Sequence, residues 1–251
     1  MTYDLNYYQS SALDPERLSP SIIVPIVMSL ARPKSVVDVG CGIGYWLSEF
    51  QRLGVERVLG LDGVHVDAEW LVIPKSLFRA IDLAQPFHLE EQFDLAVCLE
   101  VAEHLPTASA HTLVKSLVKL APAVLFSCAI PMQGGTQHVN EQWPEYWRQL
   151  FQKHDYVMLD LIRPEVWKNQ KVKFWYRQNM FLFVAADLVA TNPVFAEATH
   201  QADDLLLIHS AILREMLGLR STLKAIPRSL WQALIRRTGM SHRGKKTGST
   251  T

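Results

Sequence analysis

Residues 36–46, VVDVGCGIGYW, have the composition and spacing of a turn that holds a ligand. Asp38 is followed by Gly40, Gly42 and Gly44, so a glycine recurs at every second position after the acid. The turn joins an apolar run to a helical pattern, where backbone N–H groups and a helix amino terminus point at a bound group. Glycines let such a group approach the backbone closely. We therefore expect this turn to form part of a binding site.

Short apolar runs alternate with helical patterns around this turn, which predicts an α/β fold. The runs that predict strands are 35–40, 57–62, 77–83, 93–101, 123–130, 157–162 and 179–185. The helical patterns are 43–54, 106–121 and 144–156. Continuous apolar strands joined by helices favour a mostly parallel, doubly wound sheet of seven strands with helices on both faces. No strong helix separates the last two strands, so we expect the last strand to be antiparallel.

Acidic side chains end three of the predicted strands. Asp62 with Gly63 ends the second strand, Asp82 with Leu83 the third, and Glu100 the fourth. In open α/β sheets the ligand binds beyond the carboxyl ends of the strands. We therefore expect these residues to surround one crevice together with the glycine turn.

The spacing of the turn separates two ligand classes. Dinucleotide-binding turns follow G-x-G-x-x-G, but here Tyr45 stands where the third glycine belongs and the pattern is D-x-G-x-G-x-G. VDVGCGIG, together with FDLAVCLEVAEHLP at 93–106, resembles the class I S-adenosylmethionine (SAM)-dependent methyltransferases. Among these it is similar to bacterial enzymes of small-molecule and glycan pathways. The resemblance covers residues 35–185 in order and spacing.

The resemblance implies SAM as the methyl donor and a role for each acid. Asp38 would help to hold the cationic ammonium, Asp62 would accept the ribose hydroxyls, and Asp82 would contact the adenine amine with Leu83 on the ring. The cofactor-binding set is Asp38, Gly40, Cys41, Gly42, Gly44, Asp62, Gly63, Asp82, Leu83 and Glu100.

The long loop after the fifth strand, PMQGGTQHVNEQWPEYW at 131–147, is the expected acceptor side. Its His138 suits a general base near neutral pH, with Glu141 or Glu103 orienting it, and His104 is a second catalytic candidate. We predict O-methylation of a small-molecule or glycan hydroxyl. A divalent ion on Glu103, His104, His138 and Glu141 is an alternative, but the spacing does not require one and no metal is expected.

The charge of the chain is unevenly distributed. Residues 205–251 hold nine basic residues and one acid, although the chain has 25 of each. We expect a helical lead-in at 1–34, a SAM-binding domain at 35–190, a basic helical extension at 191–240 and a disordered tail at 241–251. The helices predicted at 203–219 and 227–239 have three open roles: packing on the acidic body, a homodimer contact, or peripheral docking on an anionic membrane.

The cysteines, the amino terminus and the charge bear on the cellular location and the binding partners. Cys41, Cys98 and Cys128 show neither metal nor redox spacing, and the amino terminus lacks a signal peptide, so a cytoplasmic location is expected. The body is not basic and carries no recognition module, so no specific nucleic-acid binding is expected. The alternatives that stay open are a SAM-binding scaffold without catalysis, a protein or RNA methyltransferase, and a nicotinamide-dependent oxidoreductase.

Overall fold

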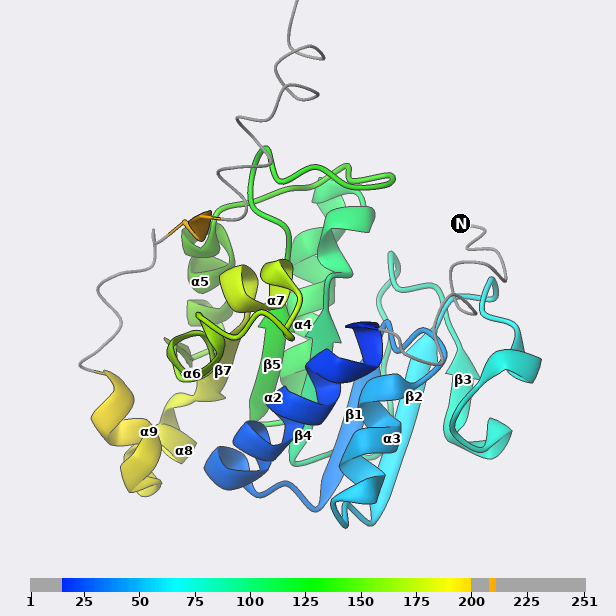
Figure 1. Cartoon of the computed structure of the whole chain (residues 1–251), viewed down its shortest axis with the longest axis horizontal. Helices are drawn as coiled ribbons and strands as arrows, with labels where there is room; N and C mark the ends of the chain where they lie inside the picture. Colours follow the sequence, from blue (N-terminus) through cyan, green and yellow to red (C-terminus); the bar gives the residue numbers. More distant parts are fainter. Residues whose placement is uncertain (1–14, 200–207, 211–251) are drawn as a thin grey trace, which may run out of the picture. The chain divides into compact units, whose positions relative to one another are not determined.

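The computed structural model describes residues 15–199 and 208–210. A seven-stranded sheet with the order β3-β2-β1-β4-β5-β7-β6 runs through it (Figure 1). The strands are β1 (Ser35–Val39), β2 (Arg57–Asp62), β3 (Phe78–Ala80), β4 (Leu95–Leu99), β5 (Ala123–Ser127), β6 (Tyr156–Leu159) and β7 (Phe181–Ala185). The neighbouring strands in the order β3-β2-β1-β4-β5 pair in parallel, and β7 is antiparallel to both β5 and β6. The predicted fold class and its antiparallel last strand are confirmed.

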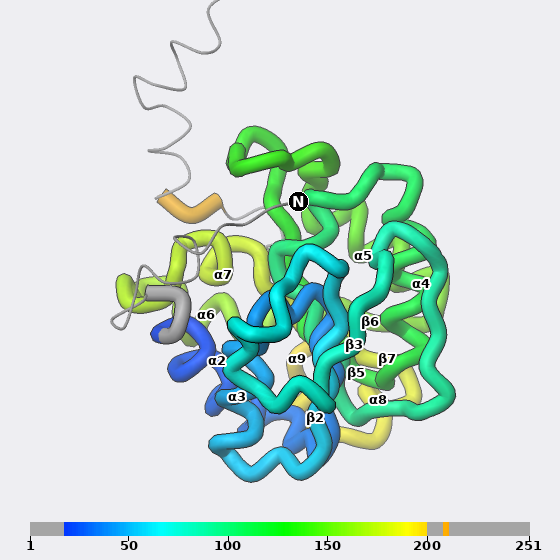
Figure 2. The backbone as a smooth tube through the Cα atoms, turned by 90° about the vertical axis from the view of Figure 1, so that its right-hand side faces the viewer, coloured from blue at the N-terminus to red at the C-terminus, as the bar shows by residue number. Residues whose placement is uncertain are grey.

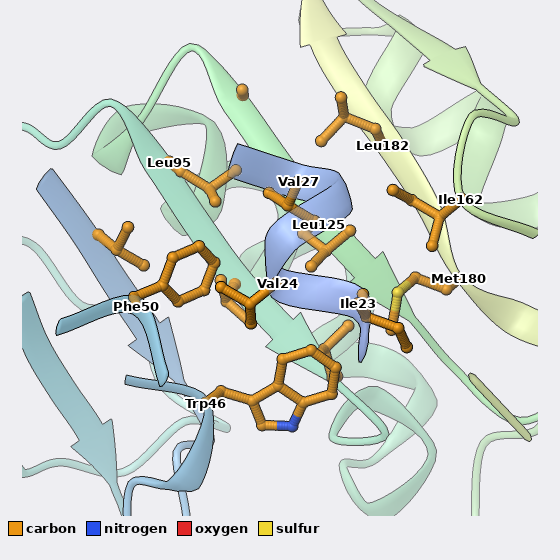
Figure 3. Packing of buried hydrophobic residues seen from close by; sticks show 14 of the residues in the cluster. Ile23, Val24, Val27, Trp46, Phe50, Leu95, Leu125, Ile162, Met180 and Leu182 are labelled. Atoms are coloured by element: carbon orange, nitrogen blue, oxygen red, sulfur yellow. The ribbon is translucent and has the colours of Figure 1, made fainter. Parts of the chain in front are cut away.

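One face of the sheet is covered by α2 (Pro15–Ala31) and α3 (Tyr45–Arg52). Ile23, Val24 and Val27 of α2 are buried against Leu95 and Leu125 of the sheet (Figure 3). Trp46 and Phe50 bring α3 into the same cluster. Helix α2, which precedes the glycine turn, therefore shares its hydrophobic core with the strands that carry the site.

The opposite face is covered by α4 (Ala110–Leu120) and α5 (Pro144–Gln152), so helices flank the sheet on both sides (Figure 2). Leu113 and Leu117 of α4 are fully buried. The Phe151 ring of α5 stacks on Phe183 of β7 with ring centroids 3.9 Å apart. This face fixes the end of β5, and the acceptor loop predicted at 131–147 follows that end and runs into α5 (Figure 1).

Short helices appear where the sequence pattern gives little signal. These are α6 (Arg163–Val166), α7 (Phe174–Asn179), α8 (Ala186–Thr191) and α9 (Pro193–Ala198). Each has at most six residues, too short for two full turns of apolar periodicity. Tertiary contacts stabilise them instead, as Val189 and Phe195 in the core illustrate.

Of the extension predicted at 191–240, the structure describes residues 191–199, which include α9, and 208–210; the predicted tail lies outside the described residues. Backbone N–H of His209 donates to the Gln178 side chain, and the His209 ring lies 4.8 Å from the Trp167 ring. In the part of the chain that the structure describes, no helix has the length and apolarity needed to cross a bilayer.

Candidate functional site

The glycine turn bends sharply between β1 and α3. Gly40 and Gly44 have φ angles of +84° and +93°, a region that residues with a Cβ rarely adopt. Backbone N–H of Gly40 donates to the Leu61 carbonyl over 2.7 Å, which anchors the turn to β2. A Cβ on Gly40 would overlap Val101 Cγ2, and one on Gly44 would lie 2.9 Å from Ile73 Cγ1. The turn therefore requires glycine at both positions.

Asp62, at the end of β2, ties the second strand to the turn. Its carboxylate accepts N–H bonds from Gly42 at 2.7 Å and from Gly63 at 2.6 Å. Burial raises the pKa of Asp62, while these two backbone bonds oppose the rise. His65 Nε2 lies 3.5 Å from the same carboxylate.

Asp38 lies inside β1, next to Asp62. Its side chain is 2 % exposed, and no described residue bonds its Oδ2 atom. Burial, and then the charge of Asp62, raise the pKa of Asp38 well above its ordinary value. A buried carboxylate oxygen without a partner costs about 1–3 kcal/mol or more, so its presence beside a glycine turn calls for a cationic partner.

The remaining predicted cofactor residues differ in how they are placed. The Cys41 side chain is buried in the core, and its backbone N–H donates to Leu61. Asp82 is exposed and accepts the N–H of Ala84 at 2.9 Å. Leu83 is buried with the α4 face of the sheet. Asp62 thus contacts the turn directly and Asp38 lies near enough to feel its charge, whereas Asp82 follows the neighbouring strand β3.

Glu100 follows β4 in a left-handed backbone conformation, with φ +54°. Its N–H donates to Ser127 Oγ at 3.1 Å, and its Oε1 accepts from Asn179 Nδ2 at 3.3 Å. Burial raises the pKa of this carboxyl. A non-glycine residue held at positive φ by its surroundings is common at functional sites.

The acceptor loop folds around the carboxylate of Glu141. Backbone N–H groups of Met132 and Gly134 each donate to it over 2.8 Å. His138 Nδ1 lies 2.9 Å from Glu141 Oε1. Because a carboxylate only accepts, Nδ1 of the neutral ring carries the proton and Nε2 keeps the lone pair. Of the two orienting residues left open by the sequence, Glu141 is the one bonded to His138.

Glu103 and His104 lie across from this loop in the 3₁₀ turn η3 (Ala102–His104). The Glu103 carbonyl accepts the N–H groups of Val139 and Asn140 at 2.8 and 3.1 Å, which fastens loop to turn. The rings of His104 and His138 meet edge to face with centroids 5.0 Å apart. Burial, then His138, lower the pKa of His104. Burial, then Glu100, raise the pKa of Glu103 well above its usual range.

Two asparagines that complete the site were not predicted as site residues. Asn140 is buried and donates to the Ala102 carbonyl at 3.2 Å. Asn179 joins Glu100 to Gln133, whose Oε1 accepts from Asn179 Nδ2 at 3.0 Å. Asn179 precedes β7 in a segment without any motif, so only the antiparallel position of β7 brings it to the site.

Comparison with known proteins assigns this site to a class. A family model described as a methyltransferase domain matches residues 15–170, and the chain belongs to that family. No curated protein matches the sequence.

Solved structures share the fold. Magnesium protoporphyrin IX methyltransferase from Synechocystis PCC 6803, crystallised with SAM, is 19 % identical with a TM-score of 0.51, over 74 % of this chain and 86 % of that one. A sugar N-methyltransferase from Streptoalloteichus sp ATCC 53650 is 12 % identical with a TM-score of 0.55, over 74 % and 94 %. An O-methyltransferase family protein from Burkholderia thailandensis is 12 % identical with a TM-score of 0.53, over 73 % and 61 %.

At these identities the likeness establishes the fold alone. Family membership and the sheet order together confirm the predicted class. The protein is a SAM-dependent methyltransferase of the class I fold, with SAM as its methyl donor.

Proposed function

We propose that this methyltransferase transfers the methyl group to a hydroxyl of a small-molecule or glycan acceptor. The observation that carries the proposal is the hydrogen bond between His138 and Glu141 in the loop beyond the carboxyl end of β5. It leaves Nε2 as a basic nitrogen, which a hydroxyl needs because its own pKa lies far above neutral. Two of the similar structures are named as a sugar N-methyltransferase and an O-methyltransferase family protein; the first supports a sugar-type acceptor, and the second supports transfer to oxygen.

The reaction is an in-line displacement. When bound, SAM supplies an electrophilic methyl carbon, which bonds to the acceptor oxygen as its bond to sulfur breaks and leaves a thioether. In our proposal His138 Nε2 takes the hydroxyl proton, and Glu141 stabilises the resulting imidazolium. The loop and the strand ends contribute alignment and exclude water, which suffices for a reaction with a good leaving group.

The acceptor class is tested by incubating the full chain with methyl-labelled SAM and fractionated cell extract. Label in the glycan or small-molecule fraction, stable to mild base where a methyl ester would hydrolyse, is the expected result. Label confined to protein or RNA would overturn the proposal.

His138→Gln is expected to lower kcat with the labelled acceptor about 100-fold or more, since the variant loses the general base. SAM affinity should stay unchanged, because His138 lies on the acceptor side. Glu141→Gln should lower kcat less, because Glu141 acts through the orientation of His138. His111→Gln is the matched control: His111 is an exposed histidine on α4. Full activity of His138→Gln would rule out the base role.

The proposed cofactor side combines the glycine turn, Asp62 and Asp38. The residues fit SAM: the uncompensated Asp38 Oδ2 can face the ammonium or sulfonium charge, and Asp62 retains lone pairs for the ribose hydroxyls. Glu100, Asp82 and Leu83 complete the proposed cofactor set at the ends of β4 and β3.

Asp38→Asn is expected to raise the Kd for SAM about 10-fold, because the variant lacks the negative charge. The variant should also change the pH dependence of stability. Since the pKa of Asp38 is raised in the folded state, its contribution is full in acid and is lost as the pH rises through that value. As the pH rises from 5 to 8, above the ordinary carboxyl pKa of about 4, the asparagine variant should therefore gain stability relative to the wild type.

Calorimetric SAM titration and denaturant unfolding at both pH values measure these effects. Asp94→Asn is the matched control, because Asp94 is likewise an aspartate beside β1 but lies at the amino end of the strand, where it accepts the backbone N–H groups of Lys34 and Ser35. It should lose stability without any change in SAM affinity. Unchanged SAM affinity in Asp38→Asn would contradict the proposed role of Asp38.

A further inference from the structure

We propose that Glu103, His104 and His138 bind a divalent first-row transition-metal ion on the acceptor side of the site. One ligand atom from each residue lies within 4.8 Å of the others. Ligands about 2 Å from one ion lie roughly 3–4 Å apart, so small side-chain rotations would complete the coordination. Imidazole nitrogens with a carboxylate oxygen form a donor set suited to ions between Mn²⁺ and Zn²⁺.

The backbone already holds the three ligands together without an ion. Glu103 and His104 share one 3₁₀ turn after β4, and His138 comes from the loop after β5. The Glu103 carbonyl binds the N–H groups of Val139 and Asn140, directly after His138. Asn140 in turn donates its side chain to Ala102. The geometry of the cluster therefore does not depend on exposed side chains that happen to meet.

Two buried polar atoms of the cluster lack partners among the described residues. Glu103 is fully buried; its Oε1 accepts the Ala129 N–H at 3.3 Å and its carboxyl lies beside that of Glu100, while its Oε2 has no hydrogen-bond donor among the described residues. His104 Nδ1 is likewise buried and unbonded. Burying a polar atom without a hydrogen bond or a bound ion lowers the stability of the fold. A cation between them satisfies a carboxylate oxygen and an imidazole lone pair at once.

Glu141 provides the support that metal-bound histidines usually have. A ligating histidine commonly donates its other ring N–H to a carboxylate, which fixes the tautomer and the ring orientation. His138 Nδ1 has such a partner in Glu141 Oε1, 2.9 Å away. The pair is rigid because Met132 and Gly134 also donate to Glu141. His138 Nε2 is then the ligand atom.

The ion would change the chemistry of the acceptor. Metal binding itself does not depend on the proposed function, but its role in the reaction does. The ion would hold and polarise the acceptor oxygen as a Lewis acid. His138 Nε2 would then bind the ion rather than take the proton, and the acceptor hydroxyl, made more acidic by the ion, would lose its proton to solvent water.

The test is a titration of the full-length, chelator-treated protein with MnCl2, followed by electron paramagnetic resonance and calorimetry. The wild type should bind one equivalent of Mn²⁺. Glu103→Gln, His104→Asn and His138→Asn should each weaken binding at least 10-fold. SAM affinity is measured for every variant as the check on folding; because Glu103 is buried, His104→Asn and His138→Asn decide the result if Glu103→Gln does not fold.

The matched control is His111→Asn, which removes one histidine of the His111–His154 pair, whose ring centroids lie 5.9 Å apart. It should leave Mn²⁺ binding unchanged. Absence of saturable binding, equal binding by wild type and both histidine variants, or an equal loss in His111→Asn would overturn the metal site.

Methyl transfer with and without EDTA separates this inference from the proposed function. Hydroxyl methylation that persists in EDTA, in a protein without Mn²⁺ binding, would refute the metal site and retain His138 as the base. Specific Mn²⁺ binding with methylation of a non-hydroxyl acceptor would support the metal site and refute the proposed function.

Discussion

Gly40→Ala is expected to abolish measurable SAM binding and to lower the free energy of unfolding by about 2–4 kcal/mol. The turn would hold the alanine in a left-handed backbone conformation at φ +84°, which a residue with a Cβ rarely adopts. Its methyl group would also overlap Val101 Cγ2. The backbone of a packed core gives way little, so the turn must shift. That shift would break the hydrogen bond from Gly40 to Leu61 and disturb the proposed cofactor turn, in which the Gly42 N–H donates to Asp62.

Gly54→Ala separates the two causes. Gly54 also has a positive φ, +91°, but a Cβ there would have no atom within 4 Å. Gly54→Ala should lower the free energy of unfolding only by the backbone strain, about 1–2 kcal/mol, and leave SAM affinity intact. Adding Val101→Ala to Gly40→Ala should recover part of the stability because it removes the overlapping methyl groups. Equal losses in Gly54→Ala and Gly40→Ala would show that the overlap has no effect.

Arg163→Met is expected to lower the free energy of unfolding by about 3–5 kcal/mol. Arg163 is 1 % exposed and forms two hydrogen bonds with Asp160, at 2.9 and 2.5 Å. It also donates to the Gln178 carbonyl, and its guanidinium lies 4.2 Å from the centre of the Phe181 ring. Methionine fills a similar volume but leaves Asp160 without its cation and Gln178 without a donor.

Arg148→Met is the matched control for this pair. Arg148 bonds Glu145 with a similar two-bond geometry, but both side chains are more than a third exposed. Exposed pairs contribute less than about 1 kcal/mol. Urea unfolding of both variants measures the difference. A loss below about 1 kcal/mol in Arg163→Met would mean that burial does not strengthen the pair.

The parts of the fold that were predictable are those whose pattern has a local physical cause. Strand β1 and the glycine turn are examples, because a buried parallel strand must be apolar and the turn must have glycine at Gly40 and Gly44. The link from His138 to Glu141 spans three residues, so the sequence already contained it as one of two options.

Contacts between distant segments could not be predicted in this way. Asn179 and Glu100 are 79 residues apart, and nothing near Asn179 indicates a polar partner. The choice of Glu141 over Glu103 as the partner of His138 depended on how the loop folds back through Met132 and Gly134. The burial of Arg163 was also hidden, because an arginine beside a proline is typical of an exposed turn.

The strand order β5-β7-β6 has a consequence for the way the chain folds during synthesis. Among the strands of residues 15–199, β6 hydrogen-bonds only to β7, although β7 follows it by some twenty residues. A nascent chain that ends before Phe181 therefore has no place for β6 and leaves β5 as an open edge. Unpaired edges of this kind favour association with other chains. We infer that the ribosome must release residues 181–185 before the sheet can close, so β7 sets the earliest moment of native folding.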